Sequence, residues 1–252
     1  MTDAVAAVGR RYLPRGWSHF WLQLGIWFGF LAAYQMARGV ADRDPARAIS
    51  NGLKVIGFEQ GHAHRLWELT IQHIAASSEL LNTAVAWTYW NSEFTVIGLA
   101  LLWVYLRRHH AFARFRNTIL LANVLGLVGY VLLPTAPPRM FPYFGFADTL
   151  GSFGGLNHGS GLVQLAGNPY AAMPSLHAAD ALIVGITLAY VCRRRLAKAV
   201  WLLWPAWVWF SVMATGNHFW LDVVAGVAVA VLALGVVHRR RLGRLVGRVV
   251  AA

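Results

Sequence analysis

The sequence WLDVVAGVAVAVLALGVV, residues Trp220–Val237, holds a single charged side chain, Asp222, in 18 positions. A helix that crosses the hydrocarbon layer of a membrane needs about 20 consecutive, mostly apolar residues. The stretch therefore predicts a transmembrane helix. The whole chain agrees, because 58% of its 252 residues are hydrophobic and 13% are charged, whereas a soluble domain carries about 25% charged residues.

Other apolar stretches of similar length lie along the chain. They predict an all-α integral membrane protein with six transmembrane helices in one bundle, which forms a single domain over residues 1–252. The first stretch follows a cluster of arginines, as in a signal peptide, but it is too long and lacks a small-residue cleavage site, so we expect a retained helix. The predicted spans are Trp17–Arg38, Trp87–Leu106, Asn117–Leu133, Ser175–Val191, Ala199–Ala214 and Trp220–Val237.

The segment Gly39–Ala86, between the first two spans, is more polar. Its apolar residues Leu66, Leu69 and Ile74 recur at near-helical spacing among acidic residues and histidines. This pattern is typical of amphipathic helices that lie on or dip into the membrane interface, here in the first outer loop. A seventh, partly polar span is the alternative.

Lysines and arginines are distributed unevenly between the loops. Sixteen of the 22 fall in the N-terminal segment, in Arg107–Arg116, in Arg193–Lys198 and after His238, all on one side of the predicted topology. By the positive-inside rule this side is the cytoplasm. We therefore expect a plasma-membrane protein with both termini in the cytoplasm and its acidic residues mostly toward the outer face.

The formal charge of +12 also raises the question of nucleic-acid binding. The basic residues occur in short clusters between apolar runs, which is typical of loops beside a membrane, so we expect no nucleic-acid partner. Cys192 is the only cysteine. An intrachain disulfide and a cysteine-rich metal site are therefore excluded.

Three polar stretches lie where the topology predicts the outer face. They are Pro134–Arg139, Asn168–His177 and Gly216–Asp222, and with the helices around them they confine the candidate catalytic motifs to residues 134–226. Ionisable groups at such depth are costly, so they usually face a cavity or one another. We expect the bundle to bring the three stretches to one outer pocket.

His218 and Asp222 are four residues apart and share one face of a helix. The carboxylate can accept a hydrogen bond from one imidazole nitrogen, which fixes the tautomer and leaves the other nitrogen as a nucleophile. The alternative is a polar pair that only stabilises the helix beside the lipid headgroups.

Pro174 and Ser175 are typical first residues of a helix. The free amides of such a first turn form an anion site, and His177 could protonate a leaving oxygen there. An ordinary serine cap with an interfacial histidine is the alternative. We also assign Leu176 and Tyr170, from the same stretch, to substrate binding.

Arg139 is the basic residue nearest these stretches, and its guanidinium suits bidentate binding of phosphate; an arginine that reaches the headgroups is the alternative. We add Asn217, beside His218, to the substrate-binding residues. Asp180 lies one turn beyond His177, where it could bind hydroxyls of a polyol or act as a structural partner. Glu93 is a weaker candidate of the same kind.

At these residues the chain resembles the type-2 phosphatidic acid phosphatase superfamily, whose pattern is K-x6-R-P, then P-S-G-H, then S-R-x5-H-x3-D. Residues 174–177 match the second element with Leu176 in place of glycine. His218 and Asp222 match the end of the third element, and Ser211 stands at its beginning. The longer form N-P-x-A-A-M-P-S-L-H resembles the branch that includes the fungal inositol phosphorylceramide synthase.

The resemblance covers roughly Asn117–Gly226. It implies a six-helix membrane enzyme with His218 as the phosphorylated nucleophile, His177 as the general acid, and no metal or other cofactor. The chain departs from the pattern at Leu132 and Val212, where the family has Lys and Arg, and at Met140, where it has Pro. Two phosphate contacts are thus missing. Either Arg43, Lys54 or Arg65 replaces them, or the substrate is a diester with less charge.

Together these features predict a ping-pong phosphoryl transfer on a phospholipid. His218 attacks phosphorus, His177 protonates the leaving alcohol, and a polyol or lipid alcohol takes the phosphoryl group. Hydrolysis of a lipid phosphate is one alternative. A lipid-binding or transport protein without enzymatic activity is another, but it would be expected to carry polar residues through the whole bundle.

Overall fold

The computed structural model describes residues 13–41, 44–151 and 169–250. Within these ranges the regular elements are helices, and an isolated bridge joins Thr135 to Ala171. The predicted all-α class is therefore confirmed. The elements are α2 (Gly16–Ala41), α3 (Pro45–Ala63), α4 (Trp67–Ala76), α5 (Glu79–Asn91), the π-helical η1 (Ser92–Val96), α6 (Ile97–Arg107), α7 (His109–Leu132), the short η2 (Pro138–Met140) and η3 (Pro142–Phe144), α9 (Leu176–Val191), α10 (Arg195–Ala214) and α11 (Trp220–Val250).

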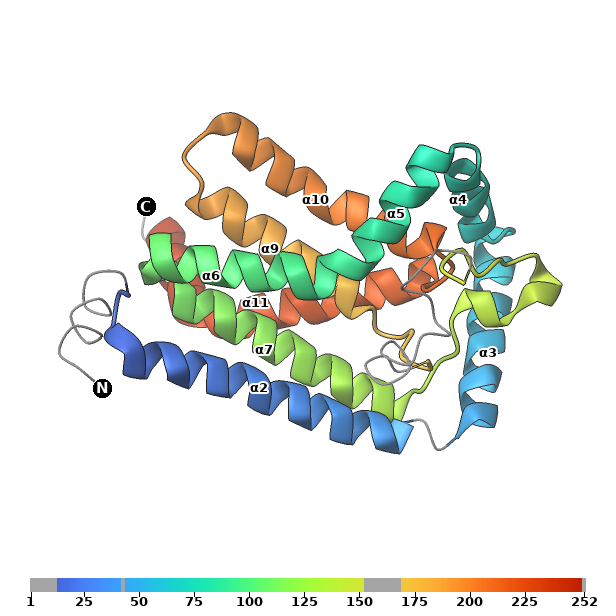
Figure 1. The fold of residues 1–252 in the computed structure, drawn as a ribbon, viewed down its shortest axis with the longest axis horizontal. Coiled ribbons are helices and arrows are strands. Elements are labelled where there is room, and N and C mark those ends of the chain that lie inside the picture. The colour runs from blue at the N-terminus through green and yellow to red at the C-terminus, as the bar shows by residue number, and fades with distance from the viewer. Residues whose placement is uncertain (1–12, 42–43, 152–168, 251–252) are drawn as a thin grey trace.

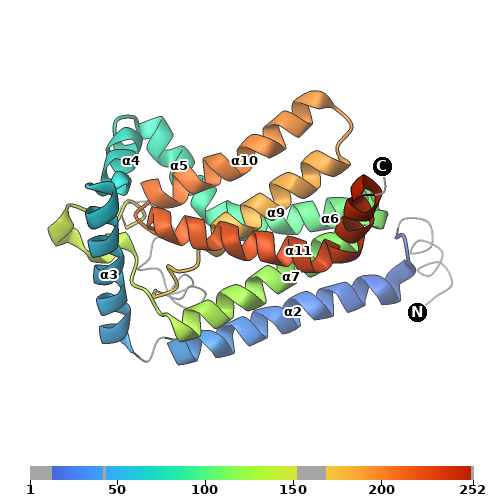
Figure 2. The same cartoon turned by 180° about the vertical axis from the view of Figure 1, so that it is seen from behind.

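Six helices, α2, α6, α7, α9, α10 and α11, run along the length of the molecule, and α3 lies across one end of them (Figure 1). The view from behind shows the same arrangement (Figure 2). The segment predicted to hold amphipathic helices forms α3, α4 and the first part of α5. Because α3 crosses the end of the bundle instead of joining it, its position supports an interfacial helix.

Within the described ranges, three helices are long and apolar enough to cross a membrane: His109–Leu132, Arg195–Ala214 and Trp220–Arg239. The helix Leu176–Val191 is apolar but shorter. The number of six spans stays a prediction. The second predicted span is one helical path that is interrupted by the π-helical turn Ser92–Val96.

Several predicted boundaries were wrong in the same direction. The expected loop Arg107–Arg116 is mostly helix, because α7 begins at His109. Likewise α10 begins at Arg195, and α11 continues to Val250. The sequence pattern marks where apolar residues end, but arginine is a good helix former and no proline stops these helices, so they continue past the apolar region.

The described parts of the basic clusters lie at one end of the bundle. The start of α2, the α6–α7 and α9–α10 connections and the end of α11 all lie opposite the end that α3 covers (Figure 1). This grouping is what the charge pattern predicted for the loops, whereas the side of the membrane that they face stays a prediction.

The main core packs between α6, α7, α9 and α11. It includes Phe115 and Ile119 of α7 and Leu176 and Ile183 of α9. Near the polar end, Gly226 of α11 lies directly against the start of α9. A Cβ atom at this position would lie 2.2 Å from the Ser175 carbonyl oxygen, so the two helices can approach this closely only with glycine there.

We expect Gly226→Ala to lower the stability of the protein, because its Cβ would meet a backbone atom that cannot move aside; overpacking of this kind costs about 1–3 kcal/mol. Thermal unfolding in detergent measures the effect. Gly235→Ala, in the same helix, is the matched control, since a Cβ at Gly235 would meet nothing within 4 Å. Equal melting temperatures for the two variants would contradict this account of the helix contact.

Candidate functional site

The three polar stretches meet at the end of the bundle that α3 covers. The amide of Arg139 donates to the Gly216 carbonyl at 2.9 Å, and the amide of Ser175 donates to the Asp222 carbonyl at 3.0 Å. These two hydrogen bonds join the loop after α7, the start of α9 and the start of α11. The candidate residues thus come from segments that lie far apart in the sequence.

His177 and His218 face each other across this junction. Their ring centroids are 5.7 Å apart, and the ring planes are inclined by 59°. His218 is 4% exposed, and the side chain of His177 is 10% exposed. Both rings are thus close enough to contact one phosphate group held between them.

A backbone carbonyl determines the tautomer of His218. Its Nδ1 lies 2.8 Å from the Ala172 carbonyl oxygen. Because a carbonyl only accepts hydrogen bonds, Nδ1 must carry the proton, and in the neutral ring Nε2 then has the free electron pair. The ring is therefore prepared as a nucleophile through Nε2.

Asp222 does not have the contact that the sequence predicted. Its Oδ2 lies 3.6 Å from Nδ1 of His218, too far for a good hydrogen bond, and accepts instead from the Phe219 amide at 2.8 Å. The reason is the position of Asp222 at the start of α11, from which its side chain reaches back to cap the helix. The buried carboxylate still lies near the imidazole and favours its positive charge.

The Arg139 side chain is hydrogen-bonded to Asn217, the residue before His218, and also lies within electrostatic reach of the Asp148 carboxylate. Its Nη1 donates to Oδ1 of Asn217 at 2.7 Å, and Nδ2 of Asn217 in turn donates to Thr215. Burial lowers the pKa of Arg139 from its ordinary value, because desolvation disfavours the charged guanidinium. Asn217 thus directs a poorly solvated cation toward the neighbourhood of His218.

Ser175 caps α9 and is not its first residue, which corrects the predicted start of this helix. Its side-chain oxygen accepts from the Ala178 amide at 3.2 Å, so this amide is already engaged. Leu176 is buried in the core. Because the Leu176 side chain packs inside the bundle, Leu176 can contact a substrate only through its backbone amide.

His177 has a partner from the π-helical turn. Its Nε2 lies 3.3 Å from Oε2 of Glu93, and its ring stacks on Tyr89 at a centroid distance of 4.6 Å. Glu93 was a weak candidate from sequence, because nothing in the local pattern shows that this turn of helix meets α9. In the structure the Glu93 carboxylate contacts His177 directly.

Asp180 faces α7 and not the two histidines. Both of its oxygens lie 3.0 Å from Nδ2 of Asn123. Tyr170 packs beside the cluster that includes Phe141 and Phe219. The structure thus gives Asp180 a structural partner, and the role of Tyr170 in substrate binding stays a prediction.

Two of the proposed replacements for the missing cations have other partners in the structure. Lys54 contacts Asn51, Arg65 stacks over Trp67 at 3.3 Å from its ring centroid, and Arg43 lies outside the described residues. At the two family positions, Val212 is fully buried and Leu132 is exposed. The guanidinium of Arg47, which the sequence did not single out, donates to the Leu132 carbonyl at 2.7 Å.

Two buried carboxylates were missed from sequence. Glu59 of α3 and Glu68 of α4 are both 0% exposed. Glu68 accepts from the Trp220 amide at 2.6 Å, and Glu59 accepts from the Leu221 amide at 3.2 Å. With Asp222 they place three carboxyl groups on the first amides of α11, where the helix dipole favours negative charge. Acidic residues in amphipathic helices usually face water, so the pattern gave no signal.

The pair also holds a proton. Burial, and then the negative charge of Glu68, raise the pKa of Glu59 from 4.5 to about 9. The folded protein therefore binds a proton on Glu59 that the unfolded chain releases above pH 4.5. The resulting stability is complete below this value and is lost as the pH rises toward and through about 9.

We expect the melting temperature to fall as the pH rises between these two values, and Glu59→Gln to reduce that fall, since glutamine keeps the acceptor for the Leu221 amide and cannot ionise. Glu79→Gln, at an exposed position, is the control and should behave like the wild type. A Glu59→Gln variant with an unchanged pH dependence of melting would show that this carboxyl does not hold the proton.

A family model described as the PAP2 superfamily matches residues 56–236. The chain belongs to this superfamily. The resemblance that was drawn from the motifs is therefore confirmed, and with it the class of phosphoryl-transfer enzyme, since members of the PAP2 superfamily are phosphatases or phosphotransferases. The helical model and the membrane family fit a membrane protein.

Two curated relatives are similar at modest identity. The phosphoinositol dihydroceramide synthase of Bacteroides thetaiotaomicron is 27% identical over 150 residues, which cover 54% of this chain and 48% of the relative. The inositol phosphorylceramide synthase of Candida albicans is 26% identical over 117 residues, which cover 41% of this chain and 24% of the relative. The match thus spans about half or less of either relative.

A solved structure, Aquifex aeolicus LpxE, has a similar fold. The TM-score is 0.52 at 16% identity, and the similarity covers 68% of this chain and 93% of the other. At this identity the comparison supports the arrangement of the helices alone.

Among the described residues, no group of three or more His, Cys, Asp or Glu side chains is placed to hold a metal ion.

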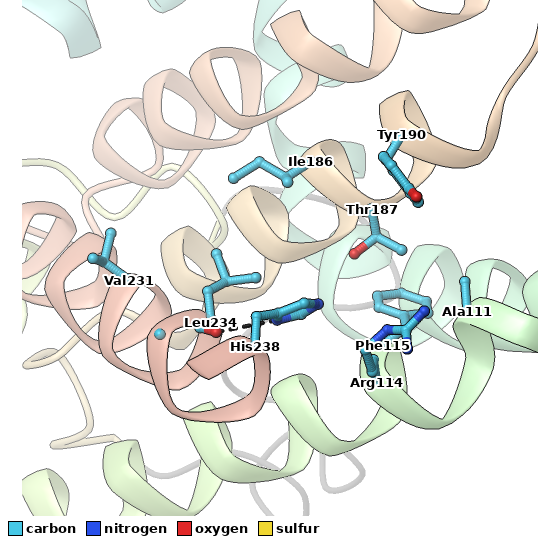
Figure 3. A pocket seen from close by; sticks show the side chains of 10 residues that line it. Ala111, Arg114, Phe115, Ile186, Thr187, Tyr190, Val231, Leu234 and His238 are labelled. Carbon is cyan, nitrogen blue, oxygen red and sulfur yellow. Dashed lines mark hydrogen bonds between the residues drawn. The ribbon is translucent and has the colours of Figure 1, made fainter. Parts of the chain in front are cut away.

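A cavity of about 450 Å³, whose lining side chains are drawn in Figure 3, lies toward the basic end of the bundle and includes neither His177 nor His218. Arg114 and His238 reach it from α7 and α11, and Thr187 and Tyr190 line it from α9. His238 is engaged with the Leu234 carbonyl through Nδ1 at 3.1 Å. None of the candidate catalytic residues lines this cavity, so the candidate site is the one at the polar end of the bundle.

Proposed function

We propose that the protein transfers a headgroup phosphate, of the inositol phosphate type, from a phospholipid to an alcohol through a phosphohistidine on His218. The observation that carries the proposal is the paired arrangement of the imidazoles, with Nδ1 of His218 bound to a carbonyl and the two rings 5.7 Å apart. One ring is prepared to attack, and the other lies where a leaving oxygen would need a proton.

In the first step Nε2 of His218 attacks phosphorus, the bond from phosphorus to the lipid oxygen breaks, and His177 gives its proton to that oxygen. Asp222 stabilises the positive charge that develops on His218. Arg139, oriented by Asn217, and the first amides of α9 bind the phosphate oxygens. In the second step an alcohol takes the phosphoryl group and passes its proton to His177.

The small number of cationic side chains at the site favours a phosphodiester as the phosphate donor. The two cationic positions of the wider family are occupied by Val212 and Leu132, and Arg139 is the arginine held next to Asn217 and His218. A phosphodiester carries less negative charge than a monoester and needs fewer cations. The names of the two curated relatives, which are synthases of inositol-phosphate lipids, agree with a diester donor.

We place the enzyme in the plasma membrane with its termini in the cytoplasm and its active site on the outer face. The support is the grouping of the basic clusters at the end of the bundle opposite the site (Figure 1), together with the positive-inside rule.

We expect a phosphoenzyme to accumulate when purified protein is mixed with a phosphorus-labelled phosphatidylinositol and quenched. His218→Ala should abolish the label because the nucleophile is lost, and His177→Ala should slow its formation by roughly 10²–10⁴-fold. His110→Ala, an exposed histidine at the basic end, is the control. Label that survives in His218→Ala would disprove the phosphohistidine.

A second experiment separates transferase from hydrolase. Mass spectrometry of lipids after incubation with donor and an alcohol should show a new phosphodiester at the expense of free headgroup phosphate. Release of headgroup phosphate with no acceptor product, at every alcohol concentration, would make the protein a lipid phosphatase and end the transferase proposal.

A further inference from the structure

A second cavity, of about 260 Å³, lies beside the site, between α2, the η1–α6 turn, α7 and α9. One wall is apolar and includes Phe30 and Leu31 of α2 and Phe94 of η1. The polar wall of the cavity is formed by Glu93, Asn123 and Asp180, and Tyr34 and Gln35 of α2 line the cavity as well. It therefore joins an apolar surface of the helices to a group of carboxylates.

The polar wall of this cavity reaches the catalytic pair through one side chain. Glu93, which lines the cavity, lies 3.3 Å from Nε2 of His177, and the His177 ring lies 5.7 Å from that of His218. A group that binds in the cavity next to Glu93 is thus separated from the His177 ring by the Glu93 side chain alone. In the proposed mechanism His177 exchanges protons with alcohols.

The polar wall also has unused acceptor capacity. Asp180 is 1% exposed, and its two oxygens share the single Nδ2 of Asn123. A carboxyl group, ionised or not, can accept more hydrogen bonds than this one shared donor supplies. Buried acceptors of this kind stabilise a ligand that brings hydroxyl or amide donors, because an unmatched polar group in this region is costly.

We propose that this cavity binds the lipid alcohol of the reaction, with its hydroxyl toward Glu93 and His177 and its alkyl part against Phe30, Leu31 and Phe94. The proposal rests on the proposed function and adds the class of alcohol and its place of entry. The same proton-transfer residue serves both half-reactions, so the alcohol that leaves the donor and the alcohol that accepts occupy this cavity in turn.

In the second half-reaction one bond to phosphorus forms and one breaks. The hydroxyl oxygen of the lipid alcohol forms a bond to phosphorus, the bond from phosphorus to His218 breaks, and the hydroxyl proton passes to His177. The imidazolium so formed lies beside the carboxylate of Glu93, which acts as a positioning residue. The cavity is smaller than the roughly 300–1,000 Å³ of a pocket that encloses a whole ligand, so the acyl chains extend into the bilayer.

The surroundings of the cavity favour a lipid over a soluble polyol. Phe28 and Met36, on either side of its α2 wall in sequence, are 64% and 77% exposed, as residues that face lipid would be. Tyr34 and Gln35 of α2 also line the cavity, but its apolar residues Phe30, Leu31, Phe94 and Ile97 have no side-chain hydrogen-bonding group to offer a small polyol. A lipid alcohol matches both walls, because its hydroxyl and its alkyl chains lie at opposite ends of the molecule.

The test uses two matched variants of α2. Leu31→Trp fills this cavity, whereas Leu24→Trp changes the same residue type two turns earlier in the same helix, in a neighbouring cavity of about 270 Å³ that shares Trp27 with the first but includes neither Glu93 nor Asp180. The donor is the 4-nitrophenyl diester of inositol phosphate, whose leaving group does not need the lipid cavity. The acceptors are 1,2-dioctanoylglycerol and glycerol, which differ only in the acyl chains.

We expect Leu31→Trp to lower transfer to dioctanoylglycerol at least about tenfold relative to Leu24→Trp, while release of nitrophenolate and transfer to glycerol stay equal in the two variants. Nitrophenolate release also reports that the protein is folded. If Leu31→Trp does not fold, the milder Leu31→Phe takes its place, with Leu24→Phe as its control.

Two results would overturn the proposal. Equal transfer to dioctanoylglycerol in both variants would show that the cavity does not bind the lipid alcohol. Transfer to glycerol but not to dioctanoylglycerol in the wild-type protein would make the acceptor a soluble polyol. If the wild-type protein forms no phosphoenzyme from any donor, the proposed function itself is wrong, and this outcome is recognised separately.

Discussion

The hydrogen bond from the Ser175 amide to the Asp222 carbonyl, 3.0 Å long, joins the beginnings of α9 and α11, and the arrangement of the site depends on it. Gly226, one turn beyond Asp222, lets the two helices approach until backbone meets backbone. His177 follows Ser175 by two residues, and His218 precedes Asp222 by four. The separation of the two imidazoles is therefore determined by a contact between main chains, which is stiffer than a contact between side chains.

The interfacial helices belong to the site as much as the bundle does. Glu59 and Glu68 bind the first amides of α11 from α3 and α4, and Asp222 completes the set from within the helix. Such amides would otherwise lie buried without partners at a considerable energetic cost. The same contacts orient the turn that carries His218, so α3 and α4 position the proposed nucleophile without touching it.

Few of the described side chains near the two histidines are cationic, whereas several are carboxyl groups. A carbonyl determines the tautomer of His218, an amide directs Arg139, and a neighbouring carboxylate faces each imidazole. In a region of low dielectric constant each of these groups acts more strongly than it would in water. A site with few cations is suited to a phosphodiester, and an opening toward apolar helix surface is suited to a lipid alcohol.

Sequence alone determined the helical class, the apolar stretches, the end of the bundle that carries the basic clusters, and the candidate residues His177, Asp222, Arg139 and His218. Each of these follows from local composition or from spacing along one helix. The continuation of α7 and α11 past the apolar region was not predictable in this way, because charged residues neither stop a helix nor mark its end.

The hydrogen-bond and ion-pair partners of the candidate residues were decided only by the tertiary structure. The choice of Ala172, and not Asp222, as the hydrogen-bond partner of His218 depends on how a loop folds over the start of α11. The contact of Glu93 with His177, and the burial of Glu59 and Glu68, join residues that are separated by 84 to 162 positions in the chain. Spacing along a sequence contains no information about such contacts, because they arise from the packing of one helix against another.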